Sequence, residues 1–224
     1  AWPLPKAPSF DADKMADIIG STGESAERFC DGFPKTPWGQ DIGIKLAGAG
    51  GDGAQTAALL LARAAINEGF DSTHIPSYGP ESRGGTSYAD VHVAKEEVLS
   101  PAAHNPHILI AFNAPSLEKF GPQVQAGGTV IYDSSVIKQP PTLDPSITMV
   151  GVPCTEIAME LGAVRAKNVV ALGAVQASTG MFPADAYLTA IRQALRHNCA
   201  MLALNEQAFS WGIKTYEETQ AKTS

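Results

Sequence analysis

The sequence predicts an α/β domain of the three-layer, Rossmann-like type, in which a mostly parallel sheet carries helices on both faces, with an extended arm at the N-terminus. Two observations support this prediction. Short apolar runs typical of buried strands alternate with amphipathic segments of helix length, and several runs end in glycine or in a polar residue that can begin a helix. The 224 residues suit one main domain, which we place at 42–210, between an arm at 1–41 and a tail at 211–224.

Composition argues against several classes of protein. The 16 Lys and Arg residues against 23 Asp and Glu residues leave a net charge of −7 with no basic run, so we expect no nucleic-acid partner. No apolar run reaches the roughly 18 residues that span a bilayer, and no signal-peptide pattern is found, so we expect no membrane contact. Cys30, Cys154 and Cys199 lie far apart and cannot form a complete metal or cluster site, so we expect no metal in this chain and a reducing, cytoplasmic location.

Residues 1–40 combine prolines with scattered aromatic side chains and show no sustained period. Proline blocks regular hydrogen bonding, and aromatic rings favour a surface to pack on, so we expect an extended arm that lies on its own domain or on a partner. Asp13 to Ile19 is the stretch most compatible with a short helix. A mobile tail is the alternative, which the aromatic content disfavours.

The centre of the predicted domain is a strand-like run from Ile42 that leads into a glycine-rich turn and then into a helical segment, Ala54 to Glu68, closed by Gly69. Backbone N–H groups at such a turn lie at the positive end of the helix dipole and can hold an anion such as phosphate. The residues predicted to contact a ligand here are Gly48, Gly50, Gly51, Asp52 and Gly53.

Three interpretations of this turn stay open. Gly48, Gly50 and Gly53 have the spacing of a dinucleotide fingerprint, but Asp52 places a carboxylate where a phosphate would approach. The acidic residue expected about 20 positions later is also missing, because the second strand ends at Tyr78. NAD is therefore the least favoured ligand, glycines that only allow close packing are the second interpretation, and another anionic ligand is the most favoured.

The remaining elements follow the same alternation. Strands are predicted at Ser72–Pro76, Thr86–Ala94, Ile108–Phe112, Thr129–Tyr132 and Ile147–Val152. Helices are predicted after Asn113 and at Thr155–Leu161, Asn168–Ser178 and Pro183–Arg196. In the strand at 86–94, small and apolar residues alternate with Tyr88, Asp90 and His92, so we expect one buried face and one exposed face.

Polar residues follow several of these strands, at the carboxyl ends where ligands of open α/β sheets gather. In the loop 78–85, the residues predicted to contact a ligand are Tyr78, Glu81, Arg83 and Gly84. Glu81 and Arg83 could equally form a local ion pair. Asn113 is a further predicted contact, although Asn113 and Asp133 could instead cap the segments that follow them.

The remaining candidates for chemistry are weaker. His104 and His107 are interrupted by Pro106, which argues against two metal ligands on one helical face, so we expect exposed loop residues. Cys154 begins a predicted helix, which lowers the thiol pKa in some proteins, but a packed residue is the commoner case. No Ser/His/Asp or Cys/His set stands out, and we predict no catalytic residue.

Five segments carry a family resemblance. They are Gly48-Ala-Gly-Gly-Asp-Gly53, Tyr78-Gly-Pro-Glu-Ser-Arg-Gly-Gly85, Phe112-Asn-Ala-Pro115, Gly127-Gly-Thr-Val-Ile-Tyr-Asp-Ser134 and the stretch from Glu156 to Leu172 with Asn168. In this order they resemble the gamma subunit of 2-oxoacid:ferredoxin oxidoreductases. The likeness covers roughly Ile42 to Arg196, and several motifs in order are far more specific than one glycine pattern.

The resemblance implies one subunit of a larger enzyme. Related complexes oxidise a 2-oxo acid with coenzyme A to an acyl-CoA, carbon dioxide and two electrons. They use thiamine diphosphate and Mg²⁺ between alpha and beta subunits, and 4Fe–4S clusters in beta and in a ferredoxin-like subunit. By the same resemblance, the glycine turn meets the coenzyme A phosphates and the loop 78–85 faces the alpha subunit. A flavin-bearing partner that passes electrons to NAD is an alternative to ferredoxin as acceptor.

Two departures from the family pattern affect this interpretation. Relatives look to have Gln at the position of Asp52, and the helix from Ala54 has Arg63 as its first cation, so phosphate binding by this chain alone is expected to be weak. The arm is longer than is usual in the family, and we interpret it as a docking arm. The rival interpretations are a stand-alone NAD-binding oxidoreductase and a purely structural subunit of the same complex.

Overall fold

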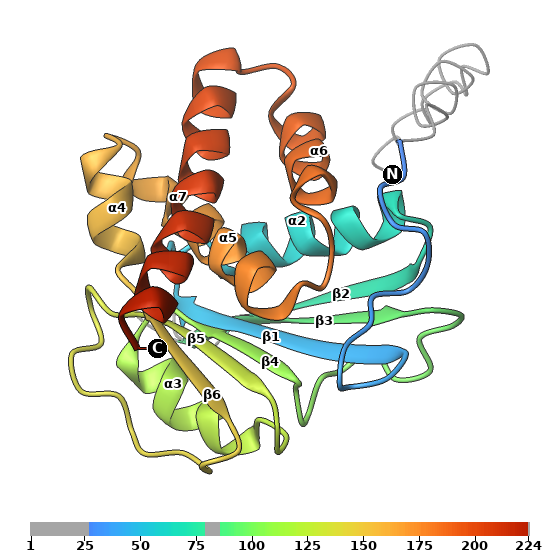
Figure 1. Cartoon of the computed structure of the whole chain (residues 1–224), viewed down its shortest axis with the longest axis horizontal. Coiled ribbons are helices and arrows are strands. Elements are labelled where there is room, and N and C mark those ends of the chain that lie inside the picture. The colour runs from blue at the N-terminus through green and yellow to red at the C-terminus, as the bar shows by residue number, and fades with distance from the viewer. Residues whose placement is uncertain (1–26, 79–85, 224) are drawn as a thin grey trace, which may run out of the picture.

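The computed structural model describes residues 27–78 and 86–223. In this part of the chain six strands form one sheet in the order β2-β3-β1-β4-β5-β6 (Figure 1). The strands are β1 (Asp41–Ala49), β2 (Asp71–Tyr78), β3 (Thr86–Ala94), β4 (Ile108–Ala111), β5 (Thr129–Asp133) and β6 (Thr148–Val152). β1, β4, β5 and β6 are parallel, whereas β3 runs antiparallel to β1 and β2. The predicted mostly parallel sheet is therefore confirmed, with β3 as its antiparallel member.

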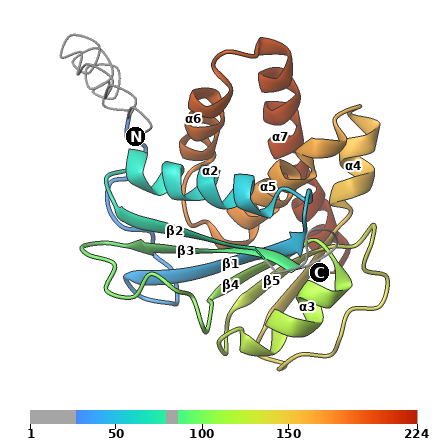
Figure 2. The ribbon, with the colours of Figure 1, turned by 180° about the vertical axis from the view of Figure 1, so that it is seen from behind.

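Helices cover both faces of the sheet, as predicted (Figures 1 and 2). One face carries α3 (Ala114–Phe120) and the short 3-10 helix η1 (Gly121–Gln123). The other face carries α2 (Ala54–Asn67), α4 (Cys154–Glu160), the 3-10 helix η2 (Val164–Ala166), α5 (Lys167–Thr179), α6 (Ala184–Leu195) and α7 (Cys199–Thr223). None of the helices in the described ranges is both long and apolar enough to cross a membrane.

The alternation of residues along β1 produces two cores. Ile42, Ile44 and Leu46 are fully buried on the side of α2 and α5, while Ala47 belongs to a second cluster on the side of α3. Both faces of β1 are covered, which is why the strand consists of apolar residues and glycine apart from Asp41 and Lys45.

The prediction of one exposed face for β3 was wrong. Asp90 and His92 are buried, like the apolar residues on the other face of the strand. β3 lies inside the sheet between β2 and β1, and the Asp90 carboxylate pairs with the buried ammonium group of Lys45 on β1. Nδ1 of His92 lies 3.0 Å from Oδ1 of Asp41, whose side chain is about half exposed. The buried polar face is tolerated here because the Asp90 carboxylate and Nδ1 of His92 have partners.

The C-terminal segment is helical, and the predicted boundary between residues 210 and 211 lies inside α7. α7 packs on α5 where Gly173 and Gly212 let the two backbones approach each other closely. A Cβ atom at Gly212 would collide with the carbonyl oxygen of Val170. Contacts of this kind leave no apolar stripe in the sequence, so the pattern did not predict this helix.

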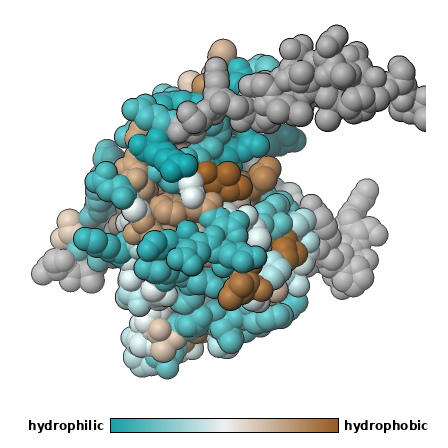
Figure 3. Space-filling view, turned by 90° about the vertical axis from the view of Figure 1, so that its right-hand side faces the viewer, coloured by the Kyte–Doolittle hydropathy of each residue, from teal (hydrophilic) through white to brown (hydrophobic). Residues whose placement is uncertain are grey.

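Residues 27–40 form no helix or strand, and Phe29, Phe33 and Trp38 pack against the main core, so this part of the arm lies on its own domain. The buried carboxylate of Glu68 accepts the backbone N–H groups of Phe29 and Cys30, at 2.9 and 2.7 Å. Figure 3 shows this side of the molecule, where apolar surface lies between hydrophilic patches. The stretch 13–19, the candidate for a short helix, lies outside the described residues.

Candidate functional site

The candidate ligand site lies at the edge of the sheet where the parallel strands end, which is the edge predicted from the sequence. β1 ends at the turn of residues 50–53, β4 is followed by Asn113, and β5 ends at Asp133. β2 ends with Tyr78 at the same edge, since it runs in the direction of β1 with β3 between them. The other predicted contacts, Glu81, Arg83 and Gly84, lie outside the described residues.

Backbone conformation or close packing within the chain requires every glycine of the turn except Gly50. Gly51 and Gly53 have φ angles of 100° and 85°, which other residues rarely adopt. A Cβ atom on Gly48 would lie 2.8 Å from Oδ2 of Asp52, and one on Gly53 would lie 2.8 Å from Nδ2 of Asn168. A Cβ atom on Gly50 would meet no atom within 4 Å, and both Gly50 and Gly51 are exposed. Close packing therefore accounts for Gly48 and Gly53 but not for Gly50.

Both oxygens of the Asp52 carboxylate accept hydrogen bonds from other residues of the chain. Its Oδ2 atom accepts the backbone N–H of Ala49 at 2.6 Å, and its Oδ1 atom accepts Nζ of Lys167, the first residue of α5, at 2.7 Å. The two side chains are largely buried, with 18% and 15% of their surface exposed. Two unit charges 4 Å apart attract by about 4 kcal/mol at an effective dielectric constant of about 20, before any cost of desolvation. We missed Lys167 from the sequence, because only Arg63 of α2 was considered as a cation near the turn.

Two side-chain amides flank the turn. Nε2 of Gln55, in the first turn of α2, donates to the carbonyl oxygen of Tyr88 at 2.8 Å and to Oγ of Ser87 at 3.2 Å, which ties the turn to β3. Nδ2 of Asn168 donates to the carbonyl oxygen of Gly53 at 3.1 Å, which ties the turn to α5. The amide oxygens of Gln55 and Asn168 are buried and have no hydrogen-bond donor within the described ranges. In both side chains the amide nitrogen faces a backbone carbonyl oxygen, which accepts but cannot donate. This fixes which end of each amide is the nitrogen and which is the oxygen.

Asn113 and Asp133 both act as caps. Oδ1 of Asn113 accepts the backbone N–H of Ser116 at 2.9 Å and so caps α3. Asp133 is 1% exposed, and it accepts Oγ1 of Thr155 at 2.5 Å and the backbone N–H of Ser135 at 3.0 Å. The alternative that both residues cap the segments after them is confirmed. Contact between Asn113 and a ligand stays a prediction.

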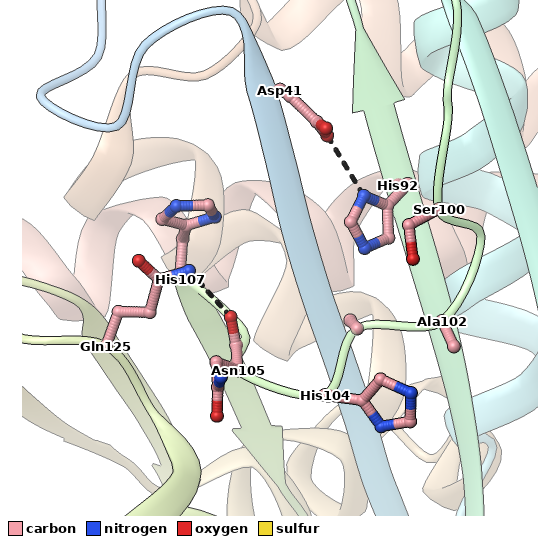
Figure 4. A pocket seen from close by; sticks show the side chains of 9 residues that line it. Asp41, His92, Ser100, Ala102, His104, Asn105, His107 and Gln125 are labelled. Atoms are coloured by element: carbon pink, nitrogen blue, oxygen red, sulfur yellow. Dashed lines mark hydrogen bonds and ion pairs between the residues drawn. The ribbon is translucent and has the colours of Figure 1, made fainter.

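A polar cavity of about 290 Å³ lies at the opposite edge of the sheet from the turn, where β1 begins (Figure 4). Nδ1 of His92 lies 3.0 Å from Oδ1 of Asp41 in this cavity. Nδ1 of His107 accepts the backbone N–H of Gly43 at 3.0 Å, and burial lowers the pKa of His107. His107 is therefore not the exposed loop residue that we predicted, whereas His104 is exposed.

The remaining predictions concern metal ligands and the thiol of Cys154. In residues 27–78 and 86–223, no group of three or more His, Cys, Asp or Glu side chains could hold a metal ion. Cys154, the first residue of α4, is 1% exposed, and burial raises its thiol pKa well above the usual value. The alternative that Cys154 is a packed residue is confirmed.

The strand order argues against a stand-alone dinucleotide site. In the Rossmann arrangement the strand after the first helix pairs directly with the first strand, so an acidic residue at its end reaches the ribose. Here β3 lies between β1 and β2, which places the end of β2 two strand spacings, or about 10 Å, from the end of β1. The glycine turn therefore has the spacing of a dinucleotide site, but the strand that would hold the ribose is not next to β1.

The fold and the turn define a Rossmann-like α/β domain in which the antiparallel β3 is inserted beside the first strand. The family model described as pyruvate ferredoxin/flavodoxin oxidoreductase matches residues 43–215, which reaches into α7. The chain belongs to this family, and the resemblance inferred from the sequence is confirmed.

Individual relatives agree with this assignment. The chain is 37% identical over 184 residues to the ketoisovalerate oxidoreductase subunit VorA of Methanothermobacter marburgensis, an alignment that covers 80% of this chain but only 38% of that protein. It is 36% identical over 145 residues to the 2-oxoglutarate synthase subunit KorC of Archaeoglobus fulgidus, covering 64% of this chain and 74% of KorC. The solved gamma subunit of a keto/oxoacid ferredoxin oxidoreductase from Geobacter sulfurreducens is 28% identical with a TM-score of 0.67, covering 79% of this chain and 99% of that subunit.

Proposed function

We propose that this chain is the gamma subunit of a thiamine-diphosphate-dependent, coenzyme A-acylating 2-oxoacid oxidoreductase complex. The complex converts a 2-oxo acid carboxylate and the coenzyme A thiol to an acyl-CoA thioester, carbon dioxide, one proton and two electrons, which pass to ferredoxin or a similar acceptor. The observation that carries the proposal is the family match over residues 43–215, which includes the glycine turn. Relatives named for ketoisovalerate and for 2-oxoglutarate support a 2-oxo acid as the substrate class.

The proposal assigns thiamine diphosphate, Mg²⁺ and the 4Fe–4S clusters to alpha, beta and ferredoxin-like partner subunits. The described residues do not fit a cluster, whose ligands are thiolates, because Cys30, Cys154 and Cys199 do not come together in a group of ligands within the described ranges. This chain supplies walls and backbone donors and no catalytic residue of its own. We place the complex in the cytoplasm, where free cysteines stay reduced.

Coenzyme A binding is proposed at the glycine turn. Gly50 and Gly51 are exposed beside the N-terminal end of α2, a helix of 14 residues whose N-cap, Gly53, forms no side-chain cap. The first backbone N–H groups of a helix have no partner within the helix and can donate to a ligand. Further proposed contacts from the neighbouring strand ends are Tyr78, Glu81, Arg83, Gly84 and Asn113.

Affinity purification of the tagged full chain tests the assembly part of this proposal. We expect thiamine-binding and ferredoxin-like subunits to co-purify, and the complex to reduce a viologen dye when given a 2-oxo acid and coenzyme A. The isolated chain is expected to show no oxidoreductase activity, and turnover by the chain alone would contradict the proposal. Tight binding of NADH to the isolated chain, measured by calorimetry, would favour the NAD-linked alternative.

A purely structural subunit is the other alternative, and Gly50→Val distinguishes it. The new side chain contacts nothing within the described chain, so it tests the approach of a ligand without disturbing the fold. In the assembled complex we expect the KM for coenzyme A to rise about tenfold, equivalent to roughly 1.4 kcal/mol of lost binding. An unchanged KM would favour the structural subunit.

A further inference from the structure

The glycine turn already holds an anion of its own. The Asp52 carboxylate accepts the Ala49 backbone N–H on one oxygen and the Lys167 ammonium group on the other, at 2.6 and 2.7 Å. A phosphate approaching the turn would meet this carboxylate at close range, and the ammonium group that could attract the phosphate is already paired. The Asp52–Lys167 pair itself carries no net charge.

Among the described residues around the turn, the exposed backbone and the side-chain oxygens without a partner are uncharged. Gly50 and Gly51 present exposed backbone. The amide oxygens of Gln55 and Asn168 are buried without a donor in the part of the chain that the structure describes, and Asn168, 3% exposed, packs directly against Gly53. Because buried acceptors are normally satisfied, these two oxygens point to an N–H donor outside the described residues. The ligand group that suits this set has N–H and C=O groups of its own and no charge.

We propose that the turn takes the pantetheine arm of coenzyme A, and that Asp52 keeps the phosphates of the same molecule away from it. This inference rests on the proposed function. Pantetheine carries two amides, each with one N–H donor and one C=O acceptor, whereas the diphosphate and the 3′-phosphate are anionic. Asp52 is therefore a specificity-determining residue: the arm that leads to the thiol lies at the turn, and the nucleotide end lies elsewhere. This replaces the expectation that the turn meets the phosphates.

The test uses two fragments of coenzyme A, pantetheine and adenosine 3′,5′-bisphosphate, as competitors of coenzyme A in the assembled complex. Gly50→Val is the probe. Gly32→Val is the matched control, because Gly32 is also exposed and a Cβ atom there also meets no atom within 4 Å. We expect Gly50→Val to raise the inhibition constant of pantetheine about tenfold and to leave that of the bisphosphate unchanged, while Gly32→Val matches the wild type in both.

The other outcomes of the competition experiment separate failure of this inference from failure of the proposed coenzyme A site. A rise for the bisphosphate, alone or together with pantetheine, would overturn the inference and leave the proposed coenzyme A site standing. A wild-type complex that pantetheine does not inhibit would overturn it as well. If neither inhibition constant nor the KM for coenzyme A responded to Gly50→Val, the proposed binding role would fail, and the inference with it.

Asp52→Asn provides a second test, in which the variant is expected to gain affinity for an anion. Asparagine keeps an oxygen for the Ala49 N–H but leaves the Lys167 ammonium group without its counter-ion. We expect inorganic pyrophosphate to inhibit the variant complex about tenfold more strongly than the wild type, because the turn then attracts anions. Equal inhibition of both complexes by pyrophosphate would overturn the role given to Asp52.

Discussion

Two lysine–aspartate pairs occupy very different surroundings in this protein. Lys45 on β1 pairs with Asp90 on β3 inside the sheet, where 4% and 9% of the side-chain surfaces are exposed. Lys167 and Asp52 pair at the glycine turn, where 15% and 18% are exposed and the neighbouring Gly50 lies open. The first pair is sealed by the fold, whereas the second lies at a surface that a ligand can reach. The same two residue types therefore join strands in one place and set the charge of a candidate site in the other.

The largest effect is expected from breaking the pair inside the sheet. Lys45→Met leaves the Asp90 carboxylate buried without its partner and removes a cation that lies 4.8 and 5.1 Å from the ring centroids of Tyr88 and Phe120. We expect the free energy of unfolding of the full chain, measured in urea, to fall by about 3–5 kcal/mol.

The double variant Lys45→Met, Asp90→Leu is the control for this prediction. It buries no charge, so most of the lost stability should return. A single variant Lys45→Met as stable as the wild type would show that the buried pair does not hold the sheet together.

A smaller effect is expected at the turn. In Lys167→Met the Asp52 carboxylate keeps its bond to the Ala49 N–H and its partial contact with water, so the free energy of unfolding should fall by only about 1 kcal/mol. The same urea experiment measures it. A loss as large as that of Lys45→Met would mean that the turn pair is sealed as well, and the contrast between the two pairs would disappear.

The smallest effect concerns pH and the edge of the sheet opposite the turn. Burial lowers the pKa of His107 from its ordinary value of 6.5, so the unfolded chain takes up protons first as the pH falls. The stability that His107 contributes is fully present above about pH 6.5 and is lost as the pH falls through its lower, folded-state pKa. His107→Asn, which can still accept the Gly43 N–H through Oδ1, should flatten the fall in unfolding free energy between about pH 7 and 5.

This slope is not expected to vanish in His107→Asn, because burial also lowers the pKa of His74. Urea unfolding of both proteins at several pH values measures the difference. An identical slope in the wild type and in His107→Asn would contradict the prediction. Lys167→Met, with its change at the other edge of the sheet, is the comparison in which we expect the wild-type slope to be kept.

Much of the region around the turn could be predicted because its signals are local. β1 and α2 have the expected order, and Gly69 follows α2 with a φ angle of 87°. The capping alternatives for Asn113 and Asp133 could also be stated in advance, since a cap and the N–H that it accepts lie close together in the chain. The same reasoning did not find Lys167, which is 115 positions from Asp52. Periodicity reports which face of an element is apolar, but it does not report which distant side chain arrives there.

By itself, the sequence determined the class of this protein: an alternation of strands and helices, a glycine turn after the first strand, and motifs in the order of one family. Only the tertiary structure decided that Asp52 pairs with Lys167, that β3 separates β1 from β2, and that Cys199–Thr223 form the helix α7. The physical reason is the range of the interactions. Preferences for strands, turns and helices arise between neighbours in the chain, whereas charge pairs, strand order and backbone contacts between helices arise only between groups that folding brings together.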